Sequence, residues 1–230
     1  MIMQLYRRLV SATKRRPKTQ SAFFEGWTQN NALVIDQSAT LKGRFSIKAG
    51  DHNTLTIGKG STFSGEIKIS GSSNRIMIGD DCVFRGQILV KGSNQTVSFG
   101  DQSTTADVYI LCQEGADVII GRKCMFSREI ELRTTDAHSV IDRATGLRIN
   151  EPASVRIGDH VWVGVGAIIN KGSDIPADCI VGAMSFVNRR FDEEGVILAG
   201  TPAKIVKRNI TWDRRRKKHF SKQAMDEWRS

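Results

Sequence analysis

Residues 157–187 read IGDHVWVGVGAIINKGSDIPADCIVGAMSFV, and every sixth residue of this stretch is aliphatic. The aliphatic positions are Ile157, Val163, Ile169, Ile175, Val181 and Val187. A period of six matches neither an α-helix nor a plain strand, but it matches a coil that turns a corner every six residues. We therefore predict an all-β solenoid with three sides per turn, in which the aliphatic residue of each side points inward.

A second position repeats in the same frame, four residues after each aliphatic one. It carries small or slim residues, namely Val161, Ala167, Ser173, Cys179 and Ser185. These residues suit a corner, where the chain leaves little room. Two periodic positions in one frame make a chance pattern a poor explanation.

The repeat extends towards the N-terminus with a longer period. IGKGSTFSGEIKI, IGDDCVFRGQILV, FGDQSTTADVYIL and IGRKCMFSREIEL begin at residues 57, 78, 99 and 120, which are 21 residues apart. Three sides of six residues make a coil of eighteen, so each of these coils has three extra residues. We expect the extra residues in the turn-forming stretches at Gly50, Gly71 and Gly92. The next interval, from Ile120 to Ile157, is 37 residues, so a loop is inserted there.

We divide the chain into three parts on this pattern. Residues 1–32 form a basic helical cap or linker, residues 33–195 form the β-helix with an inserted loop at 133–153, and residues 196–230 leave the period and end in a basic helical tail. The sequence leaves open whether the amphipathic start caps the coil or lies on a membrane surface.

Composition narrows the class of protein and its partners. The chain has no run of eighteen apolar residues and its start lacks an apolar signal region, so we expect a cytoplasmic protein. The four cysteines form no CxxC pair and are expected to be structural thiols. The net charge of +10 comes from the two ends, about +6 for residues 1–20 and +7 for residues 204–230. Basic ends suit an acidic polymer, phosphates or a peripheral membrane contact, although solvated tails explain residues 1–20 equally well.

The inserted loop is where chemistry is expected, because a long excursion on a rigid coil usually carries function. It contains His138, one of four histidines, two residues after Asp136. A histidine can accept a proton from an alcohol and return it later. On spacing alone, a solvated side chain is the competing interpretation.

Four features together carry a family resemblance. They are the six-residue ladder, TDAHSV at 135–140, IGDHVWVGVGAII at 157–169 and AGTPAKIVKRNITW at 199–212. With them the sequence resembles the hexapeptide-repeat acyltransferases, and more narrowly the bacterial O-acetyltransferases of surface polysaccharide, including the polysialic acid capsule type. The resemblance implies a left-handed parallel β-helix, a homotrimer with active sites between subunits, and acetyl-CoA as the donor.

The resemblance also implies roles for individual residues. His138 matches the catalytic histidine, which would act as general base in a direct transfer to a sugar hydroxyl. Trp162 matches a tryptophan near the thioester. The spacing of two residues, apart from the resemblance, predicts that Asp136 orients His138 from the same strand face, and a solvated acid is an equally good interpretation of Asp136. The residues expected at acetyl-CoA are Val165, Ala183, Asn188, Arg189, Lys204 and Lys207. We expect no metal and no nucleic-acid partner.

Alternatives from other classes were weighed against this interpretation. A zinc-dependent carbonic anhydrase shares the fold, but it needs three histidines, and here His138 and His160 are 22 residues apart without a near partner. A β-helical scaffold would show an aligned face of threonines, which is missing. An acetyltransferase for a small soluble sugar or a nucleotide-linked sugar stays open as the alternative function.

Overall fold

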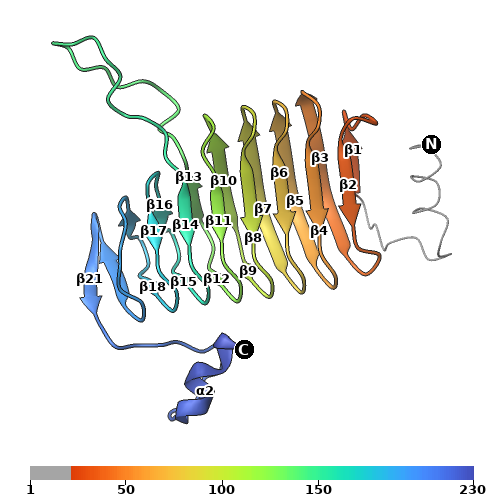
Figure 1. Cartoon of the computed structure of the whole chain (residues 1–230). Coiled ribbons are helices and arrows are strands. Elements are labelled where there is room, and N and C mark those ends of the chain that lie inside the picture. Colours follow the sequence, from red (N-terminus) through yellow and green to blue (C-terminus); the bar gives the residue numbers. More distant parts are fainter. Residues whose placement is uncertain (1–21) are drawn as a thin grey trace.

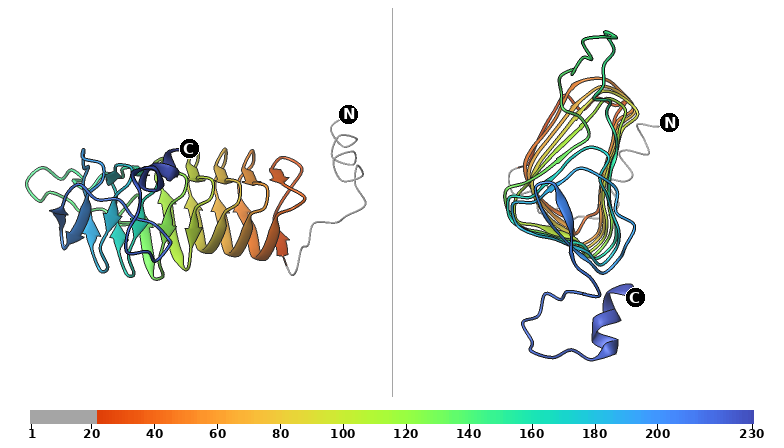
Figure 2. Two further views of the ribbon diagram at one scale, coloured as in Figure 1. Left: turned by 90° about the horizontal axis from the view of Figure 1, so that it is seen from below. Right: turned by 90° about the vertical axis from the view of Figure 1, so that its left-hand side faces the viewer.

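A computed structural model describes residues 22–230, so the expected N-terminal helix lies outside the described residues. The described chain winds into one long parallel β-helix with a triangular cross-section (Figures 1 and 2). Its strands run along three sides, which we name A, B and C. Between residues 22 and 230 no helix is long and apolar enough to cross a membrane.

Sides A and B belong to one sheet that bends at a corner, named AB. Strands β3 (Thr40–Ala49), β5 (Thr62–Ser70) and β7 (Val83–Lys91) run through this corner and pair in parallel. They bend at Gly43, Gly65 and Gly86, where a Cβ on Gly65 would lie 1.8 Å from the carbonyl oxygen of Gly86. Glycine is therefore required at the bend, because any larger residue would collide with the next coil.

The shorter strands continue the same sides. Side A holds β9 (Thr104–Thr105), β12 (Met125–Phe126), β15 (Trp162–Val163), β18 (Ile180–Val181) and β20 (Ile197–Gly200). Side B holds β1 (Ala22–Glu25), β10 (Val108–Gln113), β13 (Ile130–Arg133), β16 (Ile168–Ile169) and β19 (Phe186–Val187). Within the described residues, the coil is already present at β1, inside the segment 1–32 where a cap or linker was expected.

Side C is a separate parallel sheet. It holds β2 (Ala32–Ile35), β4 (Thr54–Ile57), β6 (Arg75–Ile78), β8 (Thr96–Phe99), β11 (Val118–Ile120), β14 (Val155–Ile157) and β17 (Asp174–Ile175). Residues pair at intervals of 21 from β4 to β11 and of 18 from β14 to β17, as the two sequence periods predict. The corners on either side of this sheet are named BC and CA.

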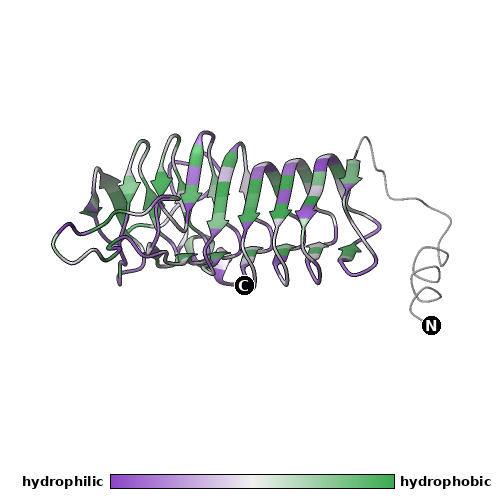
Figure 3. Ribbon diagram, turned by 90° about the horizontal axis from the view of Figure 1, so that it is seen from above, coloured by the Kyte–Doolittle hydropathy of each residue, from purple (hydrophilic) through white to green (hydrophobic). Residues whose placement is uncertain are grey.

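The predicted inward ladder forms the core. Ile157, Val163, Ile169, Ile175, Val181 and Val187 are all at most 3% exposed. The small corner residues Val161, Ala167, Ser173, Cys179 and Ser185 are buried as well. Apolar residues alternate with polar ones along the strands (Figure 3), which is the pattern of a sheet with one face in the core.

Two further ladders fill the N-terminal coils. Phenylalanine rings stack from coil to coil, with Phe63 and Phe84 parallel at a centroid distance of 4.9 Å. At corner BC, the side chains of Asn31, Asn53 and Asn74 form a buried chain of hydrogen bonds. The turns at Gly50, Gly71 and Gly92 lead into this chain with positive φ, so the three extra residues of each long coil lie where they were predicted.

The C-terminal segment leaves the coil in two steps. Strand β21 (Ala203–Lys207) turns back antiparallel onto β20 after a cis Thr201–Pro202 bond. The tail then returns along corner CA and ends in helix α2 (Lys222–Asp226) and the 3-10 turn η1 (Glu227–Arg229). The expected helical end is confirmed, and it lies against the outer corner of the coils.

Candidate active site

The inserted loop leaves corner BC between β13 and β14 and projects from the coils (Figure 1). Its tip is a small hairpin, closed by an antiparallel bridge between Ile141 and Arg148. The Asp142 carboxylate accepts hydrogen bonds from the main-chain N–H groups of Ala144 and Thr145, which shapes the turn. The loop therefore has local order of its own.

Two contacts tie the base of the loop to the coil. Glu114 accepts hydrogen bonds from Thr135 at 2.5 Å and from Arg148 at 2.6 Å. These bonds to Arg148 and Thr135 lower the pKa of the Glu114 carboxyl, which keeps it ionised for the ion pair. Residue 114 thus holds both arms of the loop.

His138 is exposed near the start of this loop, and Asn150 holds its main chain in place. The Asn150 amide donates to the carbonyl oxygen of His138 at 2.8 Å and to the Asp136 carboxylate at 2.9 Å. Asn150 is a site residue that the sequence analysis missed. Its presence twelve residues after His138 in the same insertion was the available signal.

Asp136 has other partners than the expected one. Its carboxylate pairs with Lys171 at 2.7 Å and accepts the Asn150 hydrogen bond, and the bond from Lys171 lowers its pKa. The expectation of a shared strand face with His138 was wrong, because β13 ends at Arg133 and both residues lie in irregular loop. Asp136 is thus linked to the His138 main chain through Asn150, in a chain of contacts that begins at Lys171.

Trp162 lies in β15 on side A, pointing outward and 38% exposed, as predicted from the ladder. Its ring is 6.0 Å from that of Trp212 in the tail. The His138 loop leaves the opposite corner, so one chain does not bring His138 and Trp162 together (Figure 2).

The residues expected at the cofactor fall into two groups at the C-terminal end. Val165 and Ala183 lie in successive coils at corner AB, where Met184 donates its N–H to the Val165 carbonyl. In the antiparallel pairing of β21 with β20, Lys204 lies opposite Ala199 beside this corner, and Lys207 lies opposite Ile197 further along β20. Asn188 and Arg189 follow β19 at corner BC, with the Arg189 guanidinium over the Phe191 ring.

His160 is buried. Its ring is stacked between Trp212 and Trp228 of the tail, and its Nδ1 lies 2.9 Å from Asp178. The cysteines are buried too, and burial raises the pKa of the Cys124 thiol to about 12. A thiol in that state is a poor nucleophile at neutral pH. In the part of the chain that the structure describes, no three side chains are placed to hold a metal ion.

Comparison with known proteins shows the family of the chain. The polysialic acid O-acetyltransferase of Neisseria meningitidis is 32% identical over 187 residues, which cover 81% of this chain and 87% of that protein. The chain belongs to the family of hexapeptide-repeat acetyltransferases that includes the polysialic acid O-acetyltransferases. The polysialic acid O-acetyltransferase of Escherichia coli O1:K1 is 36% identical over 98 residues. These residues cover 43% of this acetyltransferase and 32% of that protein. No protein-family model matches the chain.

Solved structures give the same result for the fold. The polysialic acid O-acetyltransferase OatWY superposes with a TM-score of 0.81 at 28% identity, covering 90% of this chain and 99% of that one. The polysialic acid-specific acetyltransferase NeuO superposes with a TM-score of 0.72, covering 90% and 95%, and at 24% identity this likeness concerns the fold alone. The acetyltransferase is thus a left-handed parallel β-helix, as the resemblance implied.

Proposed function

We propose that this acetyltransferase moves an acetyl group from acetyl-CoA to a sugar hydroxyl of an acidic capsular polysaccharide of the polysialic acid type. The observation that carries the proposal is the likeness to the Neisseria meningitidis enzyme, which spans 81% of the chain. The basic tail suits an acidic acceptor. We also propose a cytoplasmic location, because acetyl-CoA is made and used in the cytoplasm.

His138 is proposed as the general base. Acetyl-CoA supplies a thioester whose carbonyl the acceptor oxygen attacks. The His138 imidazole takes the hydroxyl proton as the new C–O bond forms, and it returns that proton to the departing thiol sulfur. The exposed His138 is free to meet a hydroxyl group, while Asn150 and the Asp136–Lys171 pair hold the loop backbone. Direct transfer needs no nucleophilic cysteine.

The chemistry of corner AB fits the donor. Val165, Ala183 and the strongly exposed Met184 offer an apolar wall for a pantetheine arm. Lys204 and Lys207 are exposed on β21, and within residues 22–230 neither forms an ion pair, so their charges are available to phosphates. We propose that these groups, with Asn188 and Arg189, hold acetyl-CoA.

We further propose that the active site is completed in a homotrimer. The His138 loop leaves corner BC while Trp162 lies on side A of the same prism, so a neighbouring chain has to bring them together. The loop also exposes four apolar side chains, Val140, Ile141, Leu147 and Ile149, each at least 51% exposed. Such side chains on a projecting hairpin favour contact with another copy of the chain.

The test is acetyl transfer from acetyl-CoA to a panel of polysialic acid, neutral oligosaccharides and nucleotide-linked sugars. We expect the wild type to favour the acidic polymer, and His138→Ala to lower kcat by about 10²–10⁴-fold. The exposed His219 of the tail offers a matched control, since His219→Ala should leave kcat unchanged. A preference for a nucleotide-linked sugar would support the alternative function, and a fully active, trimeric His138→Ala enzyme would remove His138 from the mechanism.

A further inference from the structure

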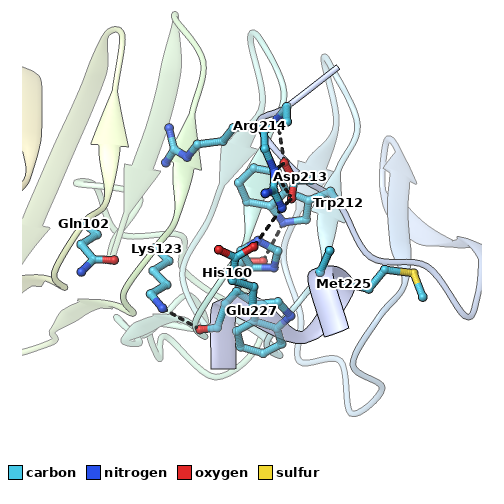
Figure 4. A pocket seen from close by; sticks show the side chains of 11 residues that line it. Gln102, Lys123, His160, Trp212, Asp213, Arg214, Met225 and Glu227 are labelled. Atoms are coloured by element: carbon cyan, nitrogen blue, oxygen red, sulfur yellow. Dashed lines mark hydrogen bonds and ion pairs between the residues drawn. The ribbon is translucent and has the colours of Figure 1, made fainter. Parts of the chain in front are cut away.

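The tail is docked on corner CA by a set of specific contacts. The Trp212 indole N–H donates to the carbonyl oxygen of His160 at 2.8 Å, and the Lys123 ammonium donates to the carbonyl oxygens of Trp228 and Ser230 at 3.1 and 2.6 Å. The His160 ring lies between the two tail indoles at centroid distances of 4.3 and 4.8 Å, nearly parallel to both. The last twenty residues therefore form a wall beside the coils (Figure 4).

A cavity of about 430 Å³ lies between this wall and the corner. Its lining includes the rings of Trp212, His160 and Trp228, together with Lys123, Arg214 and Arg215. A volume of this size admits a single sugar unit. Cationic donors in this cavity suit the carboxylate of an acidic sugar.

The cations of the cavity are only partly neutralised. Arg215 pairs with Asp213 at 2.7 Å and Glu227 at 3.0 Å, but Arg214 donates only to the Thr104 hydroxyl and the Cys124 carbonyl oxygen. Between residues 22 and 230, no carboxylate side chain pairs with Arg214. Burial lowers the pKa of Arg214, so its charge is held in a partly desolvated place without a counterion.

One buried donor at the cavity lacks an acceptor. Trp228 is 9% exposed and lines the cavity, and its indole N–H has no hydrogen-bond partner among residues 22–230. Buried donors in folded proteins are nearly always paired. An acceptor oxygen supplied by a ligand would pair it.

The cavity also lies beside the proposed reaction site. Trp212 forms part of its wall and is 6.0 Å from Trp162, the tryptophan that the proposed function places at the thioester. We infer that the tail cavity is an acceptor subsite that binds one acidic sugar unit of the polymer, beside the unit being acetylated. This inference rests on the proposed function, and it assigns the tail a role in choosing long acidic acceptors.

The test compares acceptors of different length and charge with two variants. Arg214→Gln removes the positive charge that has no counterion, and Arg214→Lys restores a positive charge at this position. We expect Arg214→Gln to raise the KM for long polysialic acid about tenfold, with kcat and the KM for acetyl-CoA unchanged. Arg214→Lys should recover most of the loss, and carboxyl-reduced polysialic acid should not distinguish the wild type from Arg214→Gln.

Trp228→Phe keeps a ring against His160 and removes the unpaired N–H. It should raise the KM for the long polymer by about threefold, in line with one hydrogen bond, while the tail stays resistant to limited proteolysis. An unchanged KM in both variants would overturn the subsite. A rise in the KM for acetyl-CoA instead would mean that the cavity serves the donor phosphates.

Quenching of tryptophan fluorescence by polysialic acid, without acetyl-CoA, separates the two proposals. If the wild type binds the polymer, Arg214→Gln weakens that binding and no acetyl transfer is seen, the proposed function fails and the subsite stands. If the wild type acetylates the polymer while both variants bind it normally, the proposed function stands and the subsite fails.

Discussion

The N-terminal and C-terminal halves of the β-helix use one architecture in different ways. Up to β11 the coils are long and regular, and the first coils share stacked phenylalanines, a buried asparagine chain and glycine bends in β3, β5 and β7. From β14 onwards the coils shorten to eighteen residues, and the inserted loop before β14, the β20–β21 turn and the docked tail interrupt the repeat. Every residue that we assign to chemistry lies in these interruptions or beside them.

We infer that the N-terminal half mainly stabilises the fold and that the C-terminal half carries the chemistry. A residue of the regular half lies between equivalent positions of the preceding and following coils, so it contributes mainly to the stacking of the coils. A residue of the interrupted half is held by contacts that occur once, such as the Asp136–Lys171 pair or the ring of His160 between two indoles. Variants in the N-terminal half should lower stability without changing the kinetics of the reaction. Variants in the C-terminal half should change the kinetics without changing stability.

The largest effect on stability is expected at the phenylalanine ladder. Phe84 is fully buried between Phe63 and Phe99, so Phe84→Ala leaves a cavity and should cost about 3–5 kcal/mol of unfolding free energy. Urea denaturation measures this loss, and Phe84→Leu provides a smaller change at the same site. If kcat of the folded Phe84→Ala enzyme fell as far as that of His138→Ala, the division between the halves would be wrong.

A smaller loss is expected at the asparagine chain. The Asn74 amide donates to Asn53 and to the carbonyl oxygen of Gly92, and its own oxygen accepts from the Gln95 N–H. Asn74→Ala leaves these buried groups unpaired and should cost about 1–3 kcal/mol. Gln87→Ala, at an exposed position of β7, is the control and should stay within about 0.5 kcal/mol of the wild type.

The smallest effect is expected at the lysines of the second half. Replacing Lys204 and Lys207 together by glutamine should raise the KM for acetyl-CoA about tenfold, or about 1.4 kcal/mol, with an unchanged urea midpoint. Steady-state kinetics with varied acetyl-CoA measure the change. Lys217→Gln, in the tail, should leave this KM alone. An equal rise in the KM values of donor and acceptor would indicate a general disturbance of the fold.

The sequence predicted the periodic part of the molecule in detail. The inward positions from Ile157 to Val187 and the corner positions beside them are all buried, and the pairing intervals follow the two periods. Periodicity succeeds here because each coil is placed by the coil next to it. The exposed placement of Trp162 follows from the same pattern, since it is next to the inward Val163.

The interruptions could not be predicted in the same way. Asp136 meets Lys171, 35 positions away, and no repeat relates the two residues. The tail leaves the period at residue 196, so nothing in the pattern indicated that Trp212 and Trp228 would enclose His160. The presence of two of the four tryptophans in this basic tail was a signal that it packs against the coils.

The most direct test of the account is complementation between two inactive variants. His138→Ala and Trp162→Ala enzymes are denatured and refolded together in equal amounts, and acetyl transfer to polysialic acid is measured. If each site takes His138 from one chain and Trp162 from its neighbour, about a quarter of the sites in randomly mixed trimers are intact and activity returns to that level. If both residues act within one chain, the mixture stays as inactive as the separate variants, and the shared site is wrong.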